Sequence, residues 1–331
     1  MPPAIFGQNE CGRFGMFKFI GSGASGPVAV VGALLCLALP AFAAAATDKV
    51  QIGDNEKVFP ESVTSIADGT LFAGSITEGV VFKSAPGAAK ALPFIPKQAD
   101  GPQSVLGVYA DEHTGLLWVC YSDLAIFSGK PSLPAVVRSF DIASGASGAS
   151  YKLPDGSFCN DVATASDGTA YISDTNGGRV LRLKPGASSL EEWLKDDSLK
   201  GVDGLSLAKD GKLYVNNVMT NSLLRVDVSG DGSPGKPSAL ALSQPIKGPD
   251  GMRFGEDGVL YLAENAAGQV DAVSIDGDKA TIKALKTGFD TPTAVSKVGN
   301  TLFVLEGKLG LMGKATDPGQ FFIYAVRLAS N

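Results

Sequence analysis

Four polar residues stand in short runs that lead into apolar, strand-like segments. They are Glu61 in FPES, Asn160 in CNDV, Asp203 in VDGL and Asp250 in GPDG. Three carboxylates and one carboxamide offer only oxygen ligands, which is the donor set that Ca²⁺ and other hard divalent cations prefer. If the fold brings these carboxylates together, they repel one another unless a cation or protons intervene. A cation held there could polarise a carbonyl or phosphoryl oxygen for hydrolysis.

The sequence lacks the residues of other common hydrolytic sites. His113 is the only histidine and stands in the turn-like segment ADEHTGLLW, so neither a Ser-His-Asp triad nor a histidine-rich zinc centre is supported. No GxSxG run is present. The run GDGSPGK at 230–236 resembles a phosphate-binding loop, but Pro237 occupies the place of the Ser or Thr that would bind magnesium.

The four polar residues belong to an internal repeat. Each unit contains a loop, a short apolar strand, an acidic-Gly or Gly-Asn turn and a second apolar strand, and further strand pairs follow. The units recur at intervals of roughly 45 residues, which is typical of propeller blades. Their first strands begin near Glu61, Val105, Asn160, Asp203, Asp250 and Thr293. The Asp-Gly pairs between alternating apolar runs predict tight hairpins of type I′.

This pattern predicts an all-β fold, a six-bladed β-propeller with four-stranded blades, as one domain over residues 47–331. We expect the run FFIYAVRL at 321–328 to be the last strand and the segment near Lys49–Ile52 to close the ring. Closure removes exposed sheet edges, which otherwise promote aggregation. Because the first strand of each blade lines the central channel, the polar residues should meet at one mouth of that channel.

A structural alternative stays open for these polar residues. Asp and Asn at strand starts often cap turns by accepting hydrogen bonds from neighbouring backbone amides. The positions of Asn160, Asp203 and Asp250 in register on successive units favour a shared site instead.

The runs FPES, CNDV, VDGL and GPDG, in this order and spacing, resemble the metal-binding blades of the senescence-marker protein, gluconolactonase and luciferin-regenerating-enzyme family. The resemblance extends over the region 47–331. It implies that Glu61, Asn160, Asp203 and Asp250 surround a divalent metal, most simply Ca²⁺, with Mg²⁺, Mn²⁺ or Zn²⁺ as other candidates. It further implies hydrolysis of a lactone or related ester, with Asp250 acting as base or nucleophile.

Two departures from the family pattern bear on this expectation. The fourth-blade ligand is usually Asn, whereas this chain has Asp203, so three carboxylates around a divalent ion leave a formal charge of about −1. We expect such a site to bind the metal more tightly and to polarise a bound carbonyl less. The first-blade run is Pro60-Glu61-Ser62, where the family more often has Glu-Gly-Pro.

The N-terminal region predicts export. Residues 1–46 read as a signal peptide, with basic residues before an apolar stretch and an Ala-rich cleavage region near 43–46. The mature protein is then secreted or periplasmic, with no membrane association. Cys120 and Cys159 remain after cleavage. In an oxidising compartment they could pair, or they could be small buried thiols, and the sequence does not decide between these.

The amino-acid composition limits the classes of molecule that this chain can bind. The formal charge of −6, with no cluster of Lys and Arg, argues against nucleic acid. We expect a monomer that acts on a small molecule. The alternative is a non-catalytic propeller that binds a ligand or a protein and keeps its metal for structure, since a fold does not dictate function. An open metal position facing Asp250 would distinguish the hydrolase from the binding protein. A third, weaker candidate is a lyase propeller, because no residue in the sequence distinguishes that function.

Overall fold

The computed structural model describes residues 48–54, 57–314 and 317–329. The chain divides into two units, Met1–Ala43 and Ala44–Asn331, and everything described belongs to the second unit. The predicted signal peptide at 1–46 lies outside the described residues and stays a prediction. Among the described residues, no helix has the length and apolar character needed to cross a membrane.

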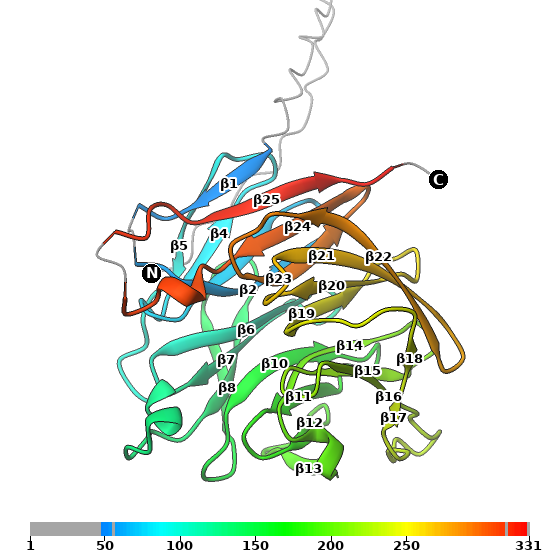
Figure 1. The fold of residues 1–331 in the computed structure, drawn as a ribbon. Coiled ribbons are helices and arrows are strands. Elements are labelled where there is room, and N and C mark those ends of the chain that lie inside the picture. Colours follow the sequence, from blue (N-terminus) through cyan, green and yellow to red (C-terminus); the bar gives the residue numbers. More distant parts are fainter. Residues whose placement is uncertain (1–47, 55–56, 315–316, 330–331) are drawn as a thin grey trace, which may run out of the picture. The chain divides into compact units, whose positions relative to one another are not determined.

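The described part of the chain is built almost entirely from antiparallel strands (Figure 1). The largest sheet has eight strands in the hydrogen-bonded order β2-β3-β4-β5-β1-β25-β24-β23. It contains β2 (Pro60–Ser65), β3 (Leu71–Ser75), β4 (Val81–Ser84), β5 (Lys90–Ile95), β1 (Lys49–Ile52), β25 (Phe322–Arg327), β24 (Thr301–Glu306) and β23 (Pro292–Val298). The second sheet contains β6 (Ser104–Asp111), β7 (Leu116–Ser122), β8 (Val136–Asp141) and β9 (Ser147–Lys152).

Three further sheets complete the strands. One contains β10 (Cys159–Thr164), β11 (Ala170–Asp174), β12 (Arg179–Leu183) and β13 (Glu191–Lys195). The next contains β14 (Val202–Leu207), β15 (Leu213–Asn217), β16 (Ser222–Val226) and β17 (Ser238–Ala239). The last contains β19 (Pro249–Phe254), β20 (Leu260–Glu264), β21 (Gln269–Asp276), β22 (Lys279–Thr287) and β18 (Ala241–Leu242). The described helices are short 3₁₀ turns: η1 (Leu124–Ser128), η2 (Asp197–Leu199) and η3 (Leu309–Leu311).

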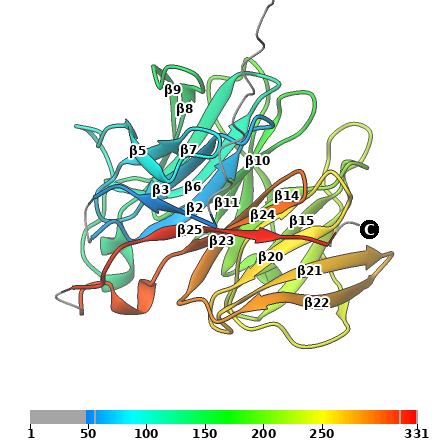
Figure 2. The same ribbon diagram turned by 90° about the horizontal axis from the view of Figure 1, so that it is seen from above.

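Six strands line the middle of this unit. β2, β6, β10, β14, β19 and β23 each pack against the next strand in this order, and β23 packs back against β2. Figures 1 and 2 show their hairpin partners lying progressively further out. The predicted all-β architecture with a central ring of strands is therefore confirmed. The sheets themselves are not uniformly four-stranded, because hydrogen bonds through β1 join the first and last sheets and β18 extends another.

The two ends of the repeat meet as the sequence predicts. β1 pairs antiparallel with β25, placing Val50 opposite Ile323, and also pairs parallel with β5. The N-terminal strand therefore hydrogen-bonds to both the first and the last repeat. It leaves neither of them with an open edge on that side.

The hairpin turns differ from the predicted type. In the β2–β3 turn the Gly69 amide donates to the Ile66 carbonyl, and the Asp68 carboxylate accepts from the Thr70 amide. Only Gly69 has a positive φ (94°). A type I′ turn needs two residues with positive φ, so this is a type I turn followed by a left-handed glycine. The Asp serves as an acceptor for the turn amide rather than as a left-handed residue.

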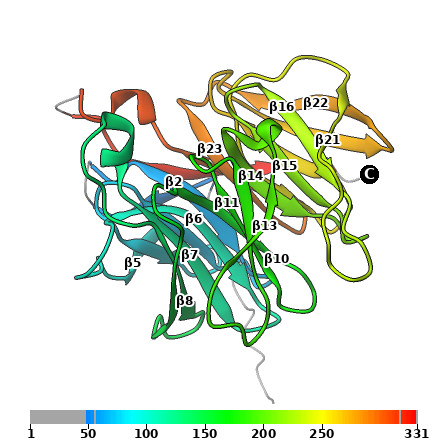
Figure 3. The same cartoon turned by 90° about the horizontal axis from the view of Figure 1, so that it is seen from below.

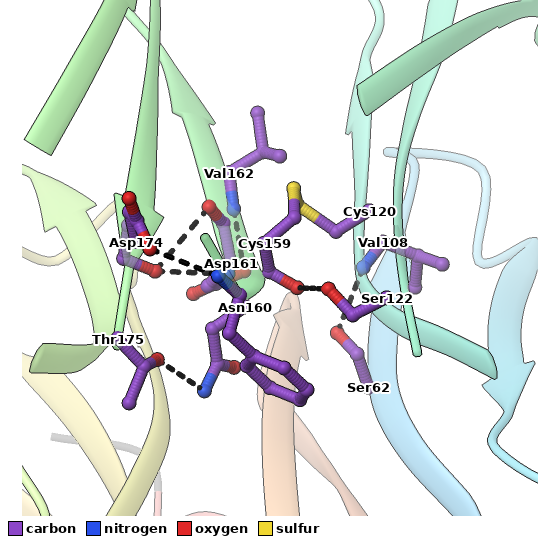
Figure 4. Close-up of a disulfide and its surroundings, with 12 residues drawn as sticks. Ser62, Val108, Cys120, Ser122, Cys159, Asn160, Asp161, Val162, Asp174 and Thr175 are labelled. Atoms are coloured by element: carbon purple, nitrogen blue, oxygen red, sulfur yellow. Dashed lines mark hydrogen bonds between the residues drawn. A yellow bond between two sulfur atoms is a disulfide. The ribbon is translucent and has the colours of Figure 1, made fainter. Parts of the chain in front are cut away.

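A disulfide joins two neighbouring sheets. Cys120 in β7 is bonded to Cys159 in β10, and their Cα atoms lie 5.3 Å apart (Figure 4). Both residues are fully buried. The alternative that the sequence left open is thus resolved in favour of pairing. The bond fastens the second repeat to the third at a residue that directly precedes Asn160.

We predict that reducing this disulfide lowers the free energy of unfolding by about 2–4 kcal/mol, because it closes a loop of 39 residues in the unfolded chain. Denaturant unfolding of the mature protein with and without a thiol reductant measures the difference. The double variant Cys120→Ala/Cys159→Ala is the control, and its unfolding should not respond to the reductant. Identical midpoints for the oxidised and reduced protein would contradict the prediction.

Candidate metal centre

Each inner strand carries an irregularity near its start, and the candidate ligands lie in it. The pairing register of β10 with β11 shifts between Cys159 and Val162, which places Asn160 in the shift. The same interruption occurs in all six inner strands. The residues placed there are Glu61, Leu106, Asn160, Asp203, Asp250 and Thr293. A bulge bends a strand and changes the direction of its side chains. The polar residues that the sequence places at the same position of successive repeats therefore lie in the same local distortion of successive strands.

This distortion gathers the predicted acids. Carboxylate oxygens of Glu61, Asp203 and Asp250 all lie within 4.8 Å of one another. Asn160 lines the same small cavity as Glu61 and Asp203. The structure therefore brings together all four residues that the sequence singled out. Turn capping alone does not explain this arrangement, because the side chains converge from four separate strands.

Two orphaned oxygens indicate that the cluster suits a cation. Oε2 of Glu61 and Oγ1 of Thr293 are buried without a hydrogen-bond partner among the described residues. Both side chains line the small cavity, and they are 8% and 0% exposed. Buried oxygens left unpaired cost free energy, which a bound ion or water removes. The donor set of carboxylate, amide and hydroxyl oxygens fits a hard divalent cation.

The electrostatics of the cluster lead to the same conclusion. Burial raises the pKa of Glu61 well above its usual range, and the charges of Asp250 and Asp203 raise it further. Burial also raises the pKa of Asp203, followed by the charges of Asp250 and Asp161. Burial raises the pKa of Asp250 to about 7, although hydrogen bonds from Asn265 and the Gly251 amide oppose the shift. Without a cation, burial and mutual repulsion therefore favour the protonated form of these carboxyl groups.

Two of the four residues are held by a partner fifteen positions later in the chain. Nδ2 of Asn160 donates to Oγ1 of Thr175 over 3.0 Å (Figure 4). Nδ2 of Asn265 donates to Oδ2 of Asp250 over 3.0 Å. Thr175 and Asn265 each directly follow the second strand of their hairpin. The first contact leaves the Asn160 carbonyl oxygen free, and the second fixes one Asp250 oxygen.

The residues fifteen positions after Glu61 and Asp203 are apolar. Ile76 follows the second strand after Glu61, and Val218 follows the second strand after Asp203. Neither side chain can donate a hydrogen bond. Asp203 has a hydrogen-bond partner in the Asn160 side chain, whereas Oε2 of Glu61 has none among the described residues, so Glu61 depends most on a cation for its orientation.

Beneath the cluster lies a buried ion pair that sequence reasoning missed. The two terminal nitrogens of the Arg253 guanidinium, Nη1 and Nη2, donate to the Asp161 carboxylate, each over 2.7 Å. Asp161 also accepts from the Leu205 amide, and the Arg253 guanidinium lies over the Tyr109 ring. The charge of Arg253 lowers the pKa of Glu61, whereas the charge of Asp161 raises it. Asp161 directly follows Asn160, and this adjacency is the only signal in the sequence.

Carboxylates at the ends of second strands fix the loops that lead into the site. Asp174 accepts from the Phe158 amide over 2.9 Å, and Glu306 accepts from the Asp290 amide over 2.9 Å. Glu264 accepts from the Lys247 amide in the same way. Each of these loops ends at the inner strand that carries a cluster residue. The disulfide adds a covalent tie, since Cys159 precedes Asn160 and its carbonyl accepts from the Ser122 hydroxyl (Figure 4).

Four polar residues at or near the ends of second strands have different roles. Asn265 contacts the cluster, whereas Tyr121 is part of the buried core. Asn217 donates to the carbonyls of Ser198 and Lys200, so it supports a loop. Asn176 is exposed and its amide donates to the Gly156 carbonyl.

The family comparison matches residues 97–305 to the family described as "SMP-30/Gluconolactonase/LRE-like region". This match covers more than half of the chain. A search of curated proteins found no match.

Solved structures share the fold at low sequence identity. Regucalcin from Agrobacterium tumefaciens, described as a calcium-binding protein, is 18% identical over 86% of this chain and 95% of that chain, with a TM-score of 0.59. A gluconolactonase from Xanthomonas campestris is 17% identical over 84% and 87%, with a TM-score of 0.58. A catalytically inactive histidine variant of virginiamycin B lyase from Staphylococcus aureus is 16% identical over 78% and 80%, with a TM-score of 0.58. These similarities identify a β-propeller fold.

We predict that Asn265→Ala weakens divalent-metal affinity by about 10-fold or more, because it frees the Asp250 carboxylate to turn away from the cluster. Calorimetric titration with Ca²⁺ measures the change. Asn176→Ala is the matched control, since Asn176 also follows a second strand but donates to a loop carbonyl instead. Equal Ca²⁺ affinities for the two variants would contradict the role given to Asn265.

Metal binding should release protons. In the metal-free protein the pKa of Asp250 is about 7 and those of Glu61 and Asp203 are raised, so a metal must displace protons below that pH. Affinity therefore falls as the pH drops through about 7. The free energy of unfolding of the metal-free protein has the opposite pH dependence. Acids whose pKa is raised in the folded state make the protein more stable as the pH falls from about 7 toward about 4. Calorimetry at about pH 6 in two buffers of different ionisation enthalpy counts the protons, and zero release would contradict the prediction.

Proposed function

Because the chain belongs to the SMP-30/gluconolactonase/LRE-like family, we propose that it is a metal-dependent hydrolase that opens a small lactone or a related ester. One observation carries the proposal: carboxylate oxygens of three acids from separate inner strands lie within 4.8 Å of one another. Such a cluster is costly to the fold unless it holds a cation. The gluconolactonase among the similar structures supports the same activity class.

We interpret the fold as six blades of four strands. β2 to β5, β6 to β9, β10 to β13 and β14 to β17 supply four blades. β19 to β22 supply the fifth, and β23 to β25 together with β1 supply the sixth. In this interpretation β18 is an added edge strand, and the eight-stranded sheet is two blades joined where β1 meets β5.

The metal would be held by Glu61, Asn160, Asp203 and Asp250, with Thr293 lining the same cavity. Calcium fits the all-oxygen donor set best, and the similar regucalcin structure is described as calcium-binding. A bound cation would polarise the lactone carbonyl and stabilise negative charge on its oxygen. The extra charge of Asp203 would strengthen metal binding at some cost to that polarisation.

Asp250 is the residue best placed to act on the substrate. Its Oδ2 accepts from Asn265 and its Oδ1 accepts from the Gly251 amide, which fixes the plane of the carboxylate. As a general base it would accept a proton from a water that attacks the lactone carbonyl. The ring C–O bond then breaks, the proton passes to the leaving oxygen, and a hydroxy acid forms. Direct attack by the same carboxylate is the other chemistry open to it.

A lyase function has less support. The lyase among the similar structures is described as inactive when one histidine is replaced. His113 is the only histidine of this chain, and it is exposed in the turn between β6 and β7, at the far end of the inner strand from the cluster. The second candidate function is therefore a non-catalytic binding propeller with a structural metal.

We further propose that the protein is exported, as its N-terminal sequence predicts, and that it acts as a monomer. A buried disulfide is typical of oxidising compartments, and Cys120–Cys159 fits that location. The mature protein would then work outside the cytoplasm on a small molecule.

The hydrolase proposal predicts that metal removal abolishes lactone hydrolysis and that restoring Ca²⁺ recovers it. Asp250→Asn should lower kcat by about 100-fold or more while still folding, because it removes the base and keeps the hydrogen bond to Gly251. Turnover of a panel of sugar and acyl lactones by the purified mature protein is the measurement. No turnover, together with a melting temperature that rises on metal addition, would favour the binding propeller instead.

A further inference from the structure

Two long loops stand over the end of the inner strands that holds the cluster. Residues 123–135 connect β7 to β8 and contain η1. The connection from β24 to β25, described for residues 307–314 and 317–321, contains η3. The other described connections at this end are short by comparison, such as 175–178 and 265–268. Figures 1 and 3 place η1 and η3 next to each other at this end.

The residues beneath these loops are apolar and adjoin the cluster. Leu106 occupies the bulge position of β6 that corresponds to the ligand positions of the other inner strands. The next residue, Gly107, fits directly against the carbonyl of Asn160, where a Cβ would come within 2.3 Å. Phe158 stands two residues before Asn160, and its carbonyl accepts from the Thr175 amide.

The loops add a second apolar layer on top of the first. Leu124 and Ile126 of η1 and Leu309 of η3 are partly exposed, and they pack against the hydrophobic cluster that contains Leu106 and Phe158. The Phe127 ring lies 4.8 Å from the Phe158 ring, yet Phe127 is 61% exposed.

A glycine allows η3 to approach the cluster. A Cβ on Gly307 would come within 2.6 Å of the Thr293 side chain and 3.3 Å of Cγ of Leu309. The absence of a side chain at 307 therefore lets Leu309 lie close to Thr293, which lines the small cavity. Leu106 and Phe158 are themselves buried, so the accessible apolar surface consists of Leu124, Ile126, Phe127 and Leu309, which we call the apolar wall.

From this arrangement we infer that the substrate carries an apolar alkyl or aryl substituent, which lies against the apolar wall while its lactone or ester group faces the acidic cluster. The inference rests on the proposed hydrolase function and specifies its substrate class. Sugar lactones are poor candidates, because their hydroxyl groups would lose hydrogen bonds to water against these side chains without gaining partners. Each methylene placed there instead gains free energy by leaving water.

The test compares γ-lactones that differ only in the length of the alkyl substituent, with glucono-δ-lactone as the polar reference. We expect kcat/KM of the Ca²⁺-loaded mature protein to rise roughly threefold for each added methylene over the first several carbons. We expect the sugar lactone to be a weaker substrate than the alkyl lactones. A flat dependence on chain length, or preference for the sugar lactone, would overturn the inference.

Two variants locate the effect. Phe127→Ala and Leu309→Ala should each lower the ratio of kcat/KM for the longest lactone to kcat/KM for γ-butyrolactone about tenfold, since only the long chain reaches the wall. Leu92→Ala is the matched control, because Leu92 is similarly exposed at 57% but belongs to β5 and is not part of either loop. A chain-length dependence that persists in both wall variants would overturn the assignment to this wall.

Binding of alkyl lactams separates the inference from the proposed function. A lactam has the shape of the lactone but resists hydrolysis, so calorimetry reports affinity alone. Lactam affinity that rises with chain length while no lactone is hydrolysed would refute the hydrolase function and support the wall as an apolar binding site. Lactone hydrolysis without any chain-length dependence would support the hydrolase function and refute the wall as an apolar binding site.

Discussion

The repulsion among three buried carboxylates is the constraint on which the rest of this structure depends. Glu61, Asp203 and Asp250 come from inner strands separated by long stretches of sequence, and each reaches the channel because its strand is distorted at that residue. A fold stabilised only by burial would not gather them, since ionised carboxylates are costly to desolvate. The strand distortions, the carboxylates that bind the loops before the inner strands, and the disulfide keep the acids close together. A bound cation would offset the repulsion among them.

The cationic side chain next to the cluster, Arg253, does not supply that positive charge. Arg253 is largely buried, but its charge is matched by Asp161, so the pair adds a fixed dipole rather than a net cation. The need for a cation at the mouth is therefore not met internally. Arg253 and Asp161 are paired with each other, whereas Glu61 of the cluster keeps a buried oxygen without a hydrogen-bond partner among the described residues.

The sequence predicted the elements that depend on local pattern. Alternating apolar runs around Asp-Gly pairs located the hairpins, and the register of the units located Glu61, Asn160, Asp203 and Asp250. Contacts between distant residues left no such signal. Asp161 and Arg253 are 92 positions apart, and the role of Asn265 follows from a loop conformation that no propensity encodes. The type I′ prediction was wrong because an Asp-Gly pair also suits a type I turn, in which the Asp accepts a hydrogen bond and only the Gly is left-handed.

The pairing of β1 with β25 has a consequence for the order in which this protein can be assembled. Val50 lies opposite Ile323, so the contact that closes the ring joins residues from opposite ends of the domain. Contacts of such high sequence separation slow folding, because a long loop must be ordered before they form. During synthesis the early blades can associate pairwise, but the circle stays open until the last strand has emerged. A circular permutant that joined these neighbouring ends and opened a surface turn would convert this late, long-range step into an early local one.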